Sequence, residues 1–305
     1  FTPPPDTRPK PAVNGPNVAE QPVPLAHQRP VDTTIGDVEI KPAEQVIFDL
    51  GEDLFARGLY GEAILQYQRL LSTFPRTKLR ERTTERIAQA YMRRAEIEEE
   101  ERTRFASLRQ EDAANEARDS AVEDYAAAVY FYQEALRRYP RSSVAGQNQL
   151  DAARSLHGIE RLQYVTGDPA EDSPAVVAAY LKVYIPLRDP SLVSFARLGI
   201  ARHYRDLGDA RMNSRMDRLA VREAYDRAVT EYGKVIAAMP PSPAAASAYF
   251  ELGTLYDGNL EMRDFAAAVF NYEELVKRFP DDPHAERAKE RALWIRDNYL
   301  AYLER

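Results

Sequence analysis

The stretch that decides the fold is IFDLGEDLFARGLYGEAILQYQRLLSTFP, residues 47–75. Its apolar residues recur every three or four positions, which is the spacing that lines one face of an α-helix. We find no alternating pattern of the kind that predicts a β-strand. Pro75 ends the stretch, because proline lacks the amide that a helix interior needs. These features predict two packed α-helices that are closed by a proline.

The second helix of this pair recurs four times along the chain. Its pattern is an aromatic residue followed, at offsets +3, +7, +10, +14 and +15, by a small residue, an aromatic, an aliphatic or small residue, a large residue and proline. The four copies are Tyr60, Ala63, Tyr67, Leu70, Phe74, Pro75; Tyr125, Ala128, Tyr132, Ala135, Tyr139, Pro140; Tyr225, Ala228, Tyr232, Val235, Met239, Pro240; and Phe265, Ala268, Tyr272, Leu275, Phe279, Pro280. The agreement indicates an internal repeat in which the small alanine admits a neighbouring helix.

A first helix precedes each of these second helices. The clearest cases are Ile47-x-x-Leu50-Gly51-x-x-Leu54 and Tyr249-x-x-Leu252-Gly253-x-x-Tyr256. Glycine in the middle of a helix costs about 1 kcal/mol relative to alanine, so we expect a neighbour to approach the backbone there. Partial matches are Phe195-x-x-Leu198-Gly199-x-x-Arg202 and Ile87-x-x-Ala90-Tyr91-x-x-Arg94.

These residues resemble the tetratricopeptide repeat (TPR) family, whose pattern runs from a large residue through Leu-Gly and Tyr to Ala, an aromatic and Pro. The first pair matches it without gaps from Ile47 to Pro75, and the last matches from Tyr249 to Pro280 with three extra residues. The resemblance implies an all-α protein, a right-handed superhelical α-solenoid of about five helix pairs with a C-terminal capping helix.

We expect helix pairs at about 43–75, 77–140, 142–187, 191–240 and 243–280, and a cap at 283–303. The pair at 142–187 matches the repeat weakly, through Ala178, Leu181 and Pro186. The pair at 77–140 contains 25 extra residues, and neither glycine nor proline occurs from Arg76 to Tyr139. We expect these residues to lengthen both helices into a protruding arm that turns near Asp112 to Glu116.

Residues 1–42 differ in composition from the rest of the chain. They contain ten of its 21 prolines and few apolar residues, which favours an extended tail over a packed element. We interpret the tail as a strap that lies along a partner, with Val23, Leu25 and Ile35 as apolar anchors. The alternative is that it acts only as a spacer.

The composition argues against several classes of function. The chain contains no cysteine. Its formal net charge of −7 does not favour binding to the phosphate backbone of nucleic acid. No run of 18 apolar residues predicts a membrane span. The four histidines are isolated, and sequence motifs for nucleotide binding or hydrolysis are absent. We therefore expect no catalytic residues, no metal and no cofactor, and we predict that the protein is not an enzyme.

The resemblance implies that the first helix of each pair lines a groove that binds partner proteins. In this register the groove residues are Phe48, Glu52, Phe55, Met92, Ile200, His203, Tyr204 and Phe250. We therefore predict a scaffold or adaptor within a larger protein complex.

The proline-rich lead and the Tyr/Phe-Pro endings also resemble a narrower group, the TPR proteins of the bacterial envelope, including the lipoprotein of the outer-membrane β-barrel assembly machine. This implies a location in the periplasm or at the outer membrane, in association with a membrane complex. Those lipoproteins begin with a lipidated cysteine, so we expect no lipid anchor at this start. The alternatives are a cytoplasmic scaffold, or a solenoid that belongs to or assists an enzyme such as a peptidoglycan-acting one.

Overall fold

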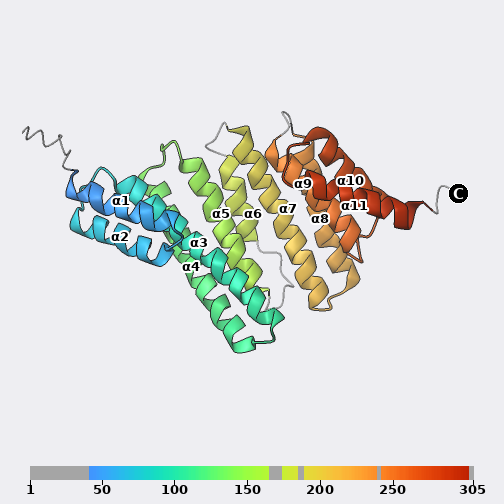
Figure 1. Cartoon of the computed structure of the whole chain (residues 1–305), viewed down its shortest axis with the longest axis horizontal. Helices are drawn as coiled ribbons and strands as arrows, with labels where there is room; N and C mark the ends of the chain where they lie inside the picture. The colour runs from blue at the N-terminus through green and yellow to red at the C-terminus, as the bar shows by residue number, and fades with distance from the viewer. Residues whose placement is uncertain (1–40, 165–173, 185–188, 239–241, 302–305) are drawn as a thin grey trace, which may run out of the picture. The chain divides into compact units, whose positions relative to one another are not determined.

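The structure is a computed structural model that describes residues 41–164, 174–184, 189–238 and 242–301. Within these ranges the chain forms eleven α-helices and no β-strand, which confirms the all-α class. Each helix packs against the next one along the chain, as Figure 1 shows. The proline-rich residues 1–40, with the predicted anchors Val23, Leu25 and Ile35, lie outside the described residues.

The helices follow one another in pairs. The first and second helices alternate as α1 (Ala43–Ala56) and α2 (Tyr60–Thr73), α3 (Arg80–Ser107) and α4 (Glu111–Arg138), α5 (Ala145–Gln163) and α6 (Pro174–Leu181), α7 (Pro190–Asn213) and α8 (Arg218–Ile236), and α9 (Pro243–Gly258) and α10 (Phe265–Arg278). A 3₁₀ turn at Lys182–Tyr184 extends α6. The final helix α11 (Ala285–Ile295) continues as a π-helical turn at Arg296–Leu300.

The face that the repeat predicts to be buried is buried. The alanines at the second position of the pattern, Ala63, Ala128, Ala228 and Ala268, have no exposed surface. The aromatics four residues later are also buried, at Tyr67, Tyr132, Tyr232 and Tyr272. Because both positions share one helix face, each second helix turns the same stripe toward its neighbours.

A tyrosine from every second helix lies against a glycine of a first helix. At each of these glycines an added Cβ atom would overlap with the tyrosine ring. The pairs are Tyr67 on Gly51, Tyr125 on Gly158, Tyr180 on Gly199, Tyr225 on Gly208 and Tyr272 on Gly253. The mid-helix glycines therefore permit the close approach that the sequence predicts, although the group that faces Gly253 most closely is the Tyr272 ring and not Ala268.

The same turn follows three of the helix pairs. In three turns the residue two positions after the repeat proline accepts a hydrogen bond from a backbone amide two residues further on. Thr77 accepts from the amide of Leu79, Ser142 from that of Val144, and Asp282 from that of His284. The amides of these three residues in turn donate to the carbonyls of Phe74, Tyr139 and Phe279. The turn thus fixes where the next first helix begins.

The extra residues of the second pair lengthen both of its helices, as predicted. Helices α3 and α4 have 28 residues each and pack against one another as an antiparallel hairpin. The predicted turn near Asp112 to Glu116 is wrong, because the chain reverses at Leu108–Gln110. Arg109 adopts a positive φ of 59° there, and the amides of Arg109 and Gln110 return to carbonyls in the last turn of α3.

The weakly matching third pair buries a different face from the one the repeat predicts. Leu181 is 48% exposed, while Val176, Tyr180 and Val183 are buried against α5 and α7. Pro186 lies outside the described residues. The difference arises because Tyr180, one residue before Leu181, is the ring that packs on Gly199.

We predict that the contact between Tyr272 and Gly253 contributes a large share of the stability of the last pair. Replacement of Gly253 by valine forces the ring away and should lower the free energy of unfolding by about 1–3 kcal/mol. Tyr272→Ala removes a ring that is only 2% exposed and should lower it by about 3–5 kcal/mol. Denaturant unfolding of the purified variants measures both changes.

The matched control is Gly233, which lies inside α8 and has no atom within 4 Å of the position that a Cβ would occupy. Gly233→Ala should raise the free energy of unfolding by about 0.5–1 kcal/mol, because alanine favours a helix. Equal effects of alanine or valine at Gly233 and Gly253 would contradict this account of the packing.

We also predict that the free end of the α3–α4 hairpin is dispensable for folding. Removal of residues 101–107 and 111–117 takes about two helical turns from each helix, preserves their phase and keeps Glu99, which contacts α5. Most of the deleted side chains are exposed. The melting temperature should therefore change little in a calorimetric scan, and loss of the cooperative transition would refute the prediction.

Candidate functional site

The buried tyrosines place their hydroxyl groups against carboxylates on the first helices. Tyr67 donates to Glu52 at 2.6 Å, and Tyr125 donates to Glu99 at 3.1 Å. Tyr232 donates to Glu251 at 2.7 Å. Desolvation by the surrounding helices, together with these carboxylates, raises the pKa of each tyrosine, so the hydroxyls remain protonated donors. Each of these buried tyrosines therefore holds an acid in place on a first helix.

At every joint an acid on one first helix pairs with a basic side chain on the adjacent first helix or on α11. We call this row of pairs the ladder. Glu52 of α1 pairs with Arg82 and Arg86 of α3, Glu99 of α3 pairs with Arg161 of α5, and Asp206 of α7 pairs with Arg161 and His157 of α5. Glu251 of α9 pairs with Arg202 and Arg205 of α7, and Asp257 of α9 pairs with Arg291 of α11. All of these residues project from first helices or from α11. The ladder therefore follows a single face of the repeat array.

The contacts of the ladder are short and charge-assisted. Arg161 Nη2 lies 2.6 Å from Glu99 Oε2, and Arg291 binds Asp257 through two nitrogens at 2.6 and 2.8 Å. The carboxylates are mostly buried while the arginines are partly exposed. Such fork-like contacts fix the orientation of the guanidinium planes, so the ladder presents arginine N–H groups in defined directions.

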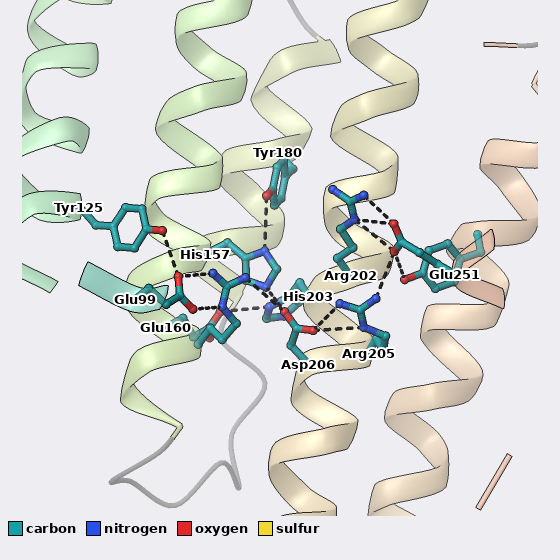
Figure 2. Close-up of polar contacts among 12 residues, drawn as sticks. Glu99, Tyr125, His157, Glu160, Tyr180, Arg202, His203, Arg205, Asp206 and Glu251 are labelled. Carbon is teal, nitrogen blue, oxygen red and sulfur yellow. Dashed lines mark hydrogen bonds and ion pairs between the residues drawn. The ribbon is translucent and has the colours of Figure 1, made fainter. Parts of the chain in front are cut away.

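The joint between α5 and α7 contains two histidines in a reciprocal arrangement. His157 of α5 lies 3.2 Å from Asp206 of α7, and His203 of α7 lies 3.0 Å from Glu160 of α5. The two rings lie 5.6 Å apart and are almost fully buried. Figure 2 shows both pairs beside the hydroxyl of Tyr180, which lies 3.5 Å from His157 Nδ1. With the proton on Nε2, the N–H is on the ring nitrogen that approaches Asp206, and Nδ1 can accept from Tyr180.

Burial and the neighbouring polar groups together determine the ionisation of this joint. Desolvation lowers the pKa of His157 below its ordinary value, although the nearby Asp206 opposes the shift. The pKa of Asp206 is also lowered: burial acts in the opposite direction, and the His157 hydrogen bond and the nearby Arg205 and Arg161 outweigh it. Asp206 is therefore ionised at neutral pH, and His157 is neutral.

Two cavities open on the face that the ladder follows. The first has a volume of about 690 Å³ and is lined mainly by α3, α5 and α7, including Glu99, Arg161 and Asp206. The second has a volume of about 570 Å³ and is lined by α9, α10 and α11, including Phe250, Arg291 and Trp294. Both volumes lie within the range that holds small ligands or a few residues of a peptide.

The structure places the eight predicted groove residues in different settings. Phe48, Ile200 and His203 are buried in contacts between helices. Met92 is buried but reaches the wall of the first cavity, and Phe250 lines the second. The remaining three residues, Glu52, Phe55 and Tyr204, are half-buried. Glu52 and Phe55 lie next to Arg86, and Tyr204 lines a separate groove beside α8. Whether these residues contact a partner stays a prediction.

Most polar residues of this face were not predicted from the sequence. Glu52 of the ladder was predicted, but its arginines were not, nor were Glu99, Asp206, Glu251 and Asp257. An acid one or four residues after a mid-helix glycine was a usable signal in two pairs, at Gly51-Glu52 and Gly253-x-x-x-Asp257. The arginines gave no such signal, because arginine is frequent throughout the chain.

The described ranges hold no helix whose length and apolar character would let it cross a membrane. Within the same ranges, no three histidine, cysteine or acidic side chains gather as a metal site would require. No protein-family model matches the sequence, and no curated protein matches it.

The α5–α7 joint predicts a dependence of stability on pH. The pKa of His157 is lower in the folded than in the unfolded chain, so the unfolded chain binds the proton first as the pH falls. Stability is therefore present above the ordinary histidine pKa of about 6.5 and declines below it. The charged or titratable groups that act on His157 are Tyr180 from α6, Asp206 and His203 from α7, and Arg161 from α5, while Arg205 pairs with Asp206.

We expect His157→Gln to lose less stability than the unsubstituted chain between pH 7.5 and pH 5.5. Unfolding in urea at each pH measures the difference. His284, which is exposed and stacks on Phe250, supplies the control substitution His284→Gln. A variant at His157 that follows the same pH profile as the control would refute the assignment.

Proposed function

We propose that this chain is a non-enzymatic TPR-type scaffold, in which the helix pairs form a right-handed superhelical solenoid closed by α11, and that it binds other proteins along the face of its first helices. The observation that supports the proposal is that the two cavities described above open on this one face. Helices α3, α5 and α7 contribute most of the lining of one, and α9, α10 and α11 line the other. A solenoid of packed pairs leaves such a face open to extended ligands.

The ladder makes this face suitable for a protein ligand. Because its carboxylates are held by tyrosines and arginines of the chain, the guanidinium groups are oriented before a partner arrives. Oriented donors lose less conformational freedom on binding, which favours association. The resemblance of the repeat to bacterial envelope proteins supports a periplasmic or outer-membrane-associated assembly as the setting, with a cytoplasmic assembly as the alternative.

Site-specific photo-crosslinking in cells of the native source tests the proposal. We place a photoreactive amino acid at Thr103 in the first cavity and at Thr254 in the second, both of which are exposed. Control positions are Tyr130 on α4 and Phe270 on α10, which are more than 60% exposed and line neither cavity. We expect a discrete crosslinked protein from the cavity positions only. Crosslinks from the control positions alone would refute the proposed binding face.

A further inference from the structure

The cavity between α3, α5 and α7 has two walls of different charge. Helices α5 and α7 contribute Arg154, Arg161, Arg202 and Arg205, whereas α3 contributes Glu96, Glu99 and Glu100. We propose that this cavity binds a bipolar peptide segment, in which an acidic side chain faces Arg154 and Arg202 and a basic side chain faces Glu96 and Glu100. This inference rests on the proposed function and specifies the chemistry of the partner.

Arginines on the α5–α7 wall retain hydrogen-bond donors that no group of the described chain accepts. Arg202 binds Glu251 through Nε and Nη2, and within the described chain its Nη1 makes no hydrogen bond. Arg154 binds Asp151 through Nη1 alone, which leaves Nε and Nη2. Arg154, Arg161 and Arg202 all line the cavity from α5 and α7. A carboxylate brought to this wall receives donors that are already oriented.

The acids of the opposite wall are available to a cation. Glu100 is exposed and makes no ion pair within the described residues. Within the same residues, Glu96 forms an ion pair with Arg93 of its own helix alone, and both side chains are substantially exposed. Exposed pairs of this kind contribute little, so a lysine or arginine of a partner can replace Arg93 at small cost.

The balance of charge argues against a uniformly acidic or basic ligand. The lining contains the arginines Arg93, Arg154, Arg161, Arg202 and Arg205 and the acids Glu96, Glu99, Glu100 and Asp206. An acidic peptide that reaches Arg154 also passes the α3 acids, and a basic peptide meets the guanidinium wall. The half-buried Phe195 lies in the lining as well, with the Arg154 guanidinium over its ring, and provides an apolar surface beside the acid-binding position.

Selection of a random 12-residue peptide library displayed on phage tests the proposal with the full chain as bait. We expect the enriched peptides to contain both an acidic and a basic residue within a few positions of each other. Bait with Glu96→Gln and Glu100→Gln should enrich peptides that lack the basic residue, and bait with Arg154→Gln should enrich peptides that lack the acidic one. The control bait has Arg137→Glu and Glu123→Lys, which are exposed on α4 outside the cavity, and should enrich the same peptides as the unsubstituted chain.

The best bipolar peptide, labelled with a fluorophore, then gives an affinity by anisotropy. Loss of one charge-assisted contact should weaken binding about tenfold in each cavity variant and leave the control variant unchanged. Arg202→Gln serves as a second variant of the arginine wall. Circular dichroism verifies that each variant is folded. Arg154 makes a single hydrogen bond within its own helix, so if Arg202→Gln unfolds, the affinity of Arg154→Gln still tests the arginine wall.

The outcomes separate this inference from the proposed function. Enrichment of uniformly acidic, uniformly basic or uncharged peptides overturns the bipolar ligand while a protein-binding face stands. Absence of enrichment together with crosslinks from Thr103 also overturns the bipolar ligand alone. Absence of both enrichment and crosslinks overturns this inference and the binding face together.

Discussion

The structure depends on the close approach of a tyrosine ring to the backbone of a neighbouring helix. In every pair a second helix places such a ring where the Cβ of any residue larger than glycine would stand. The contact brings two helices together more closely than aliphatic side chains allow, and it buries a large apolar surface at the same time. It also has a direction, because the hydroxyl must find a partner. At several joints that partner is a carboxylate on a first helix, so a packing contact determines where charge appears on the surface.

The ladder follows from this geometry. A carboxylate that accepts from a buried tyrosine cannot move far, and in a partly buried position it needs a counter-charge. The following helix supplies an arginine at Glu99 with Arg161 of α5 and at Asp257 with Arg291 of α11, and the preceding first helix α7 supplies the arginines at Glu251. Arginine suits this role because its fork satisfies two carboxylate oxygens and leaves donors that point elsewhere. The polar face of the first helices is thus a consequence of how the interior is packed, and the arginine donors that remain are the groups that the proposed partner would contact.

The sequence predicted the parts of this structure that recur and failed where they do not. The buried alanines and tyrosines of the second helices share one set of offsets, so Ala63, Tyr67, Ala268 and Tyr272 could be assigned from spacing alone. The third pair lacks the offsets, and its buried Tyr180 lies one position from the predicted Leu181. The turn of the long hairpin was misplaced because Leu108 to Gln110 contains neither glycine nor proline, and Arg109 adopts a positive φ there instead. The cross-helix partners of the ladder come from different pairs, and spacing within one helix does not contain that information.

The middle of the array differs from its two well-matched ends in how neighbouring first helices are joined. At Glu52 and at Asp257 the joint is an acid held by arginines that remain charged at any physiological pH. Between α5 and α7, His157 and His203 take part, and Tyr180 from the short helix α6 contacts His157 instead of a carboxylate. The same joint forms part of the wall of the larger cavity through His157 and Asp206. A ligand that engages Arg161 or Arg205 there shares Asp206 with His157, so occupancy of the cavity and the protonation of this buried histidine act on the same carboxylate.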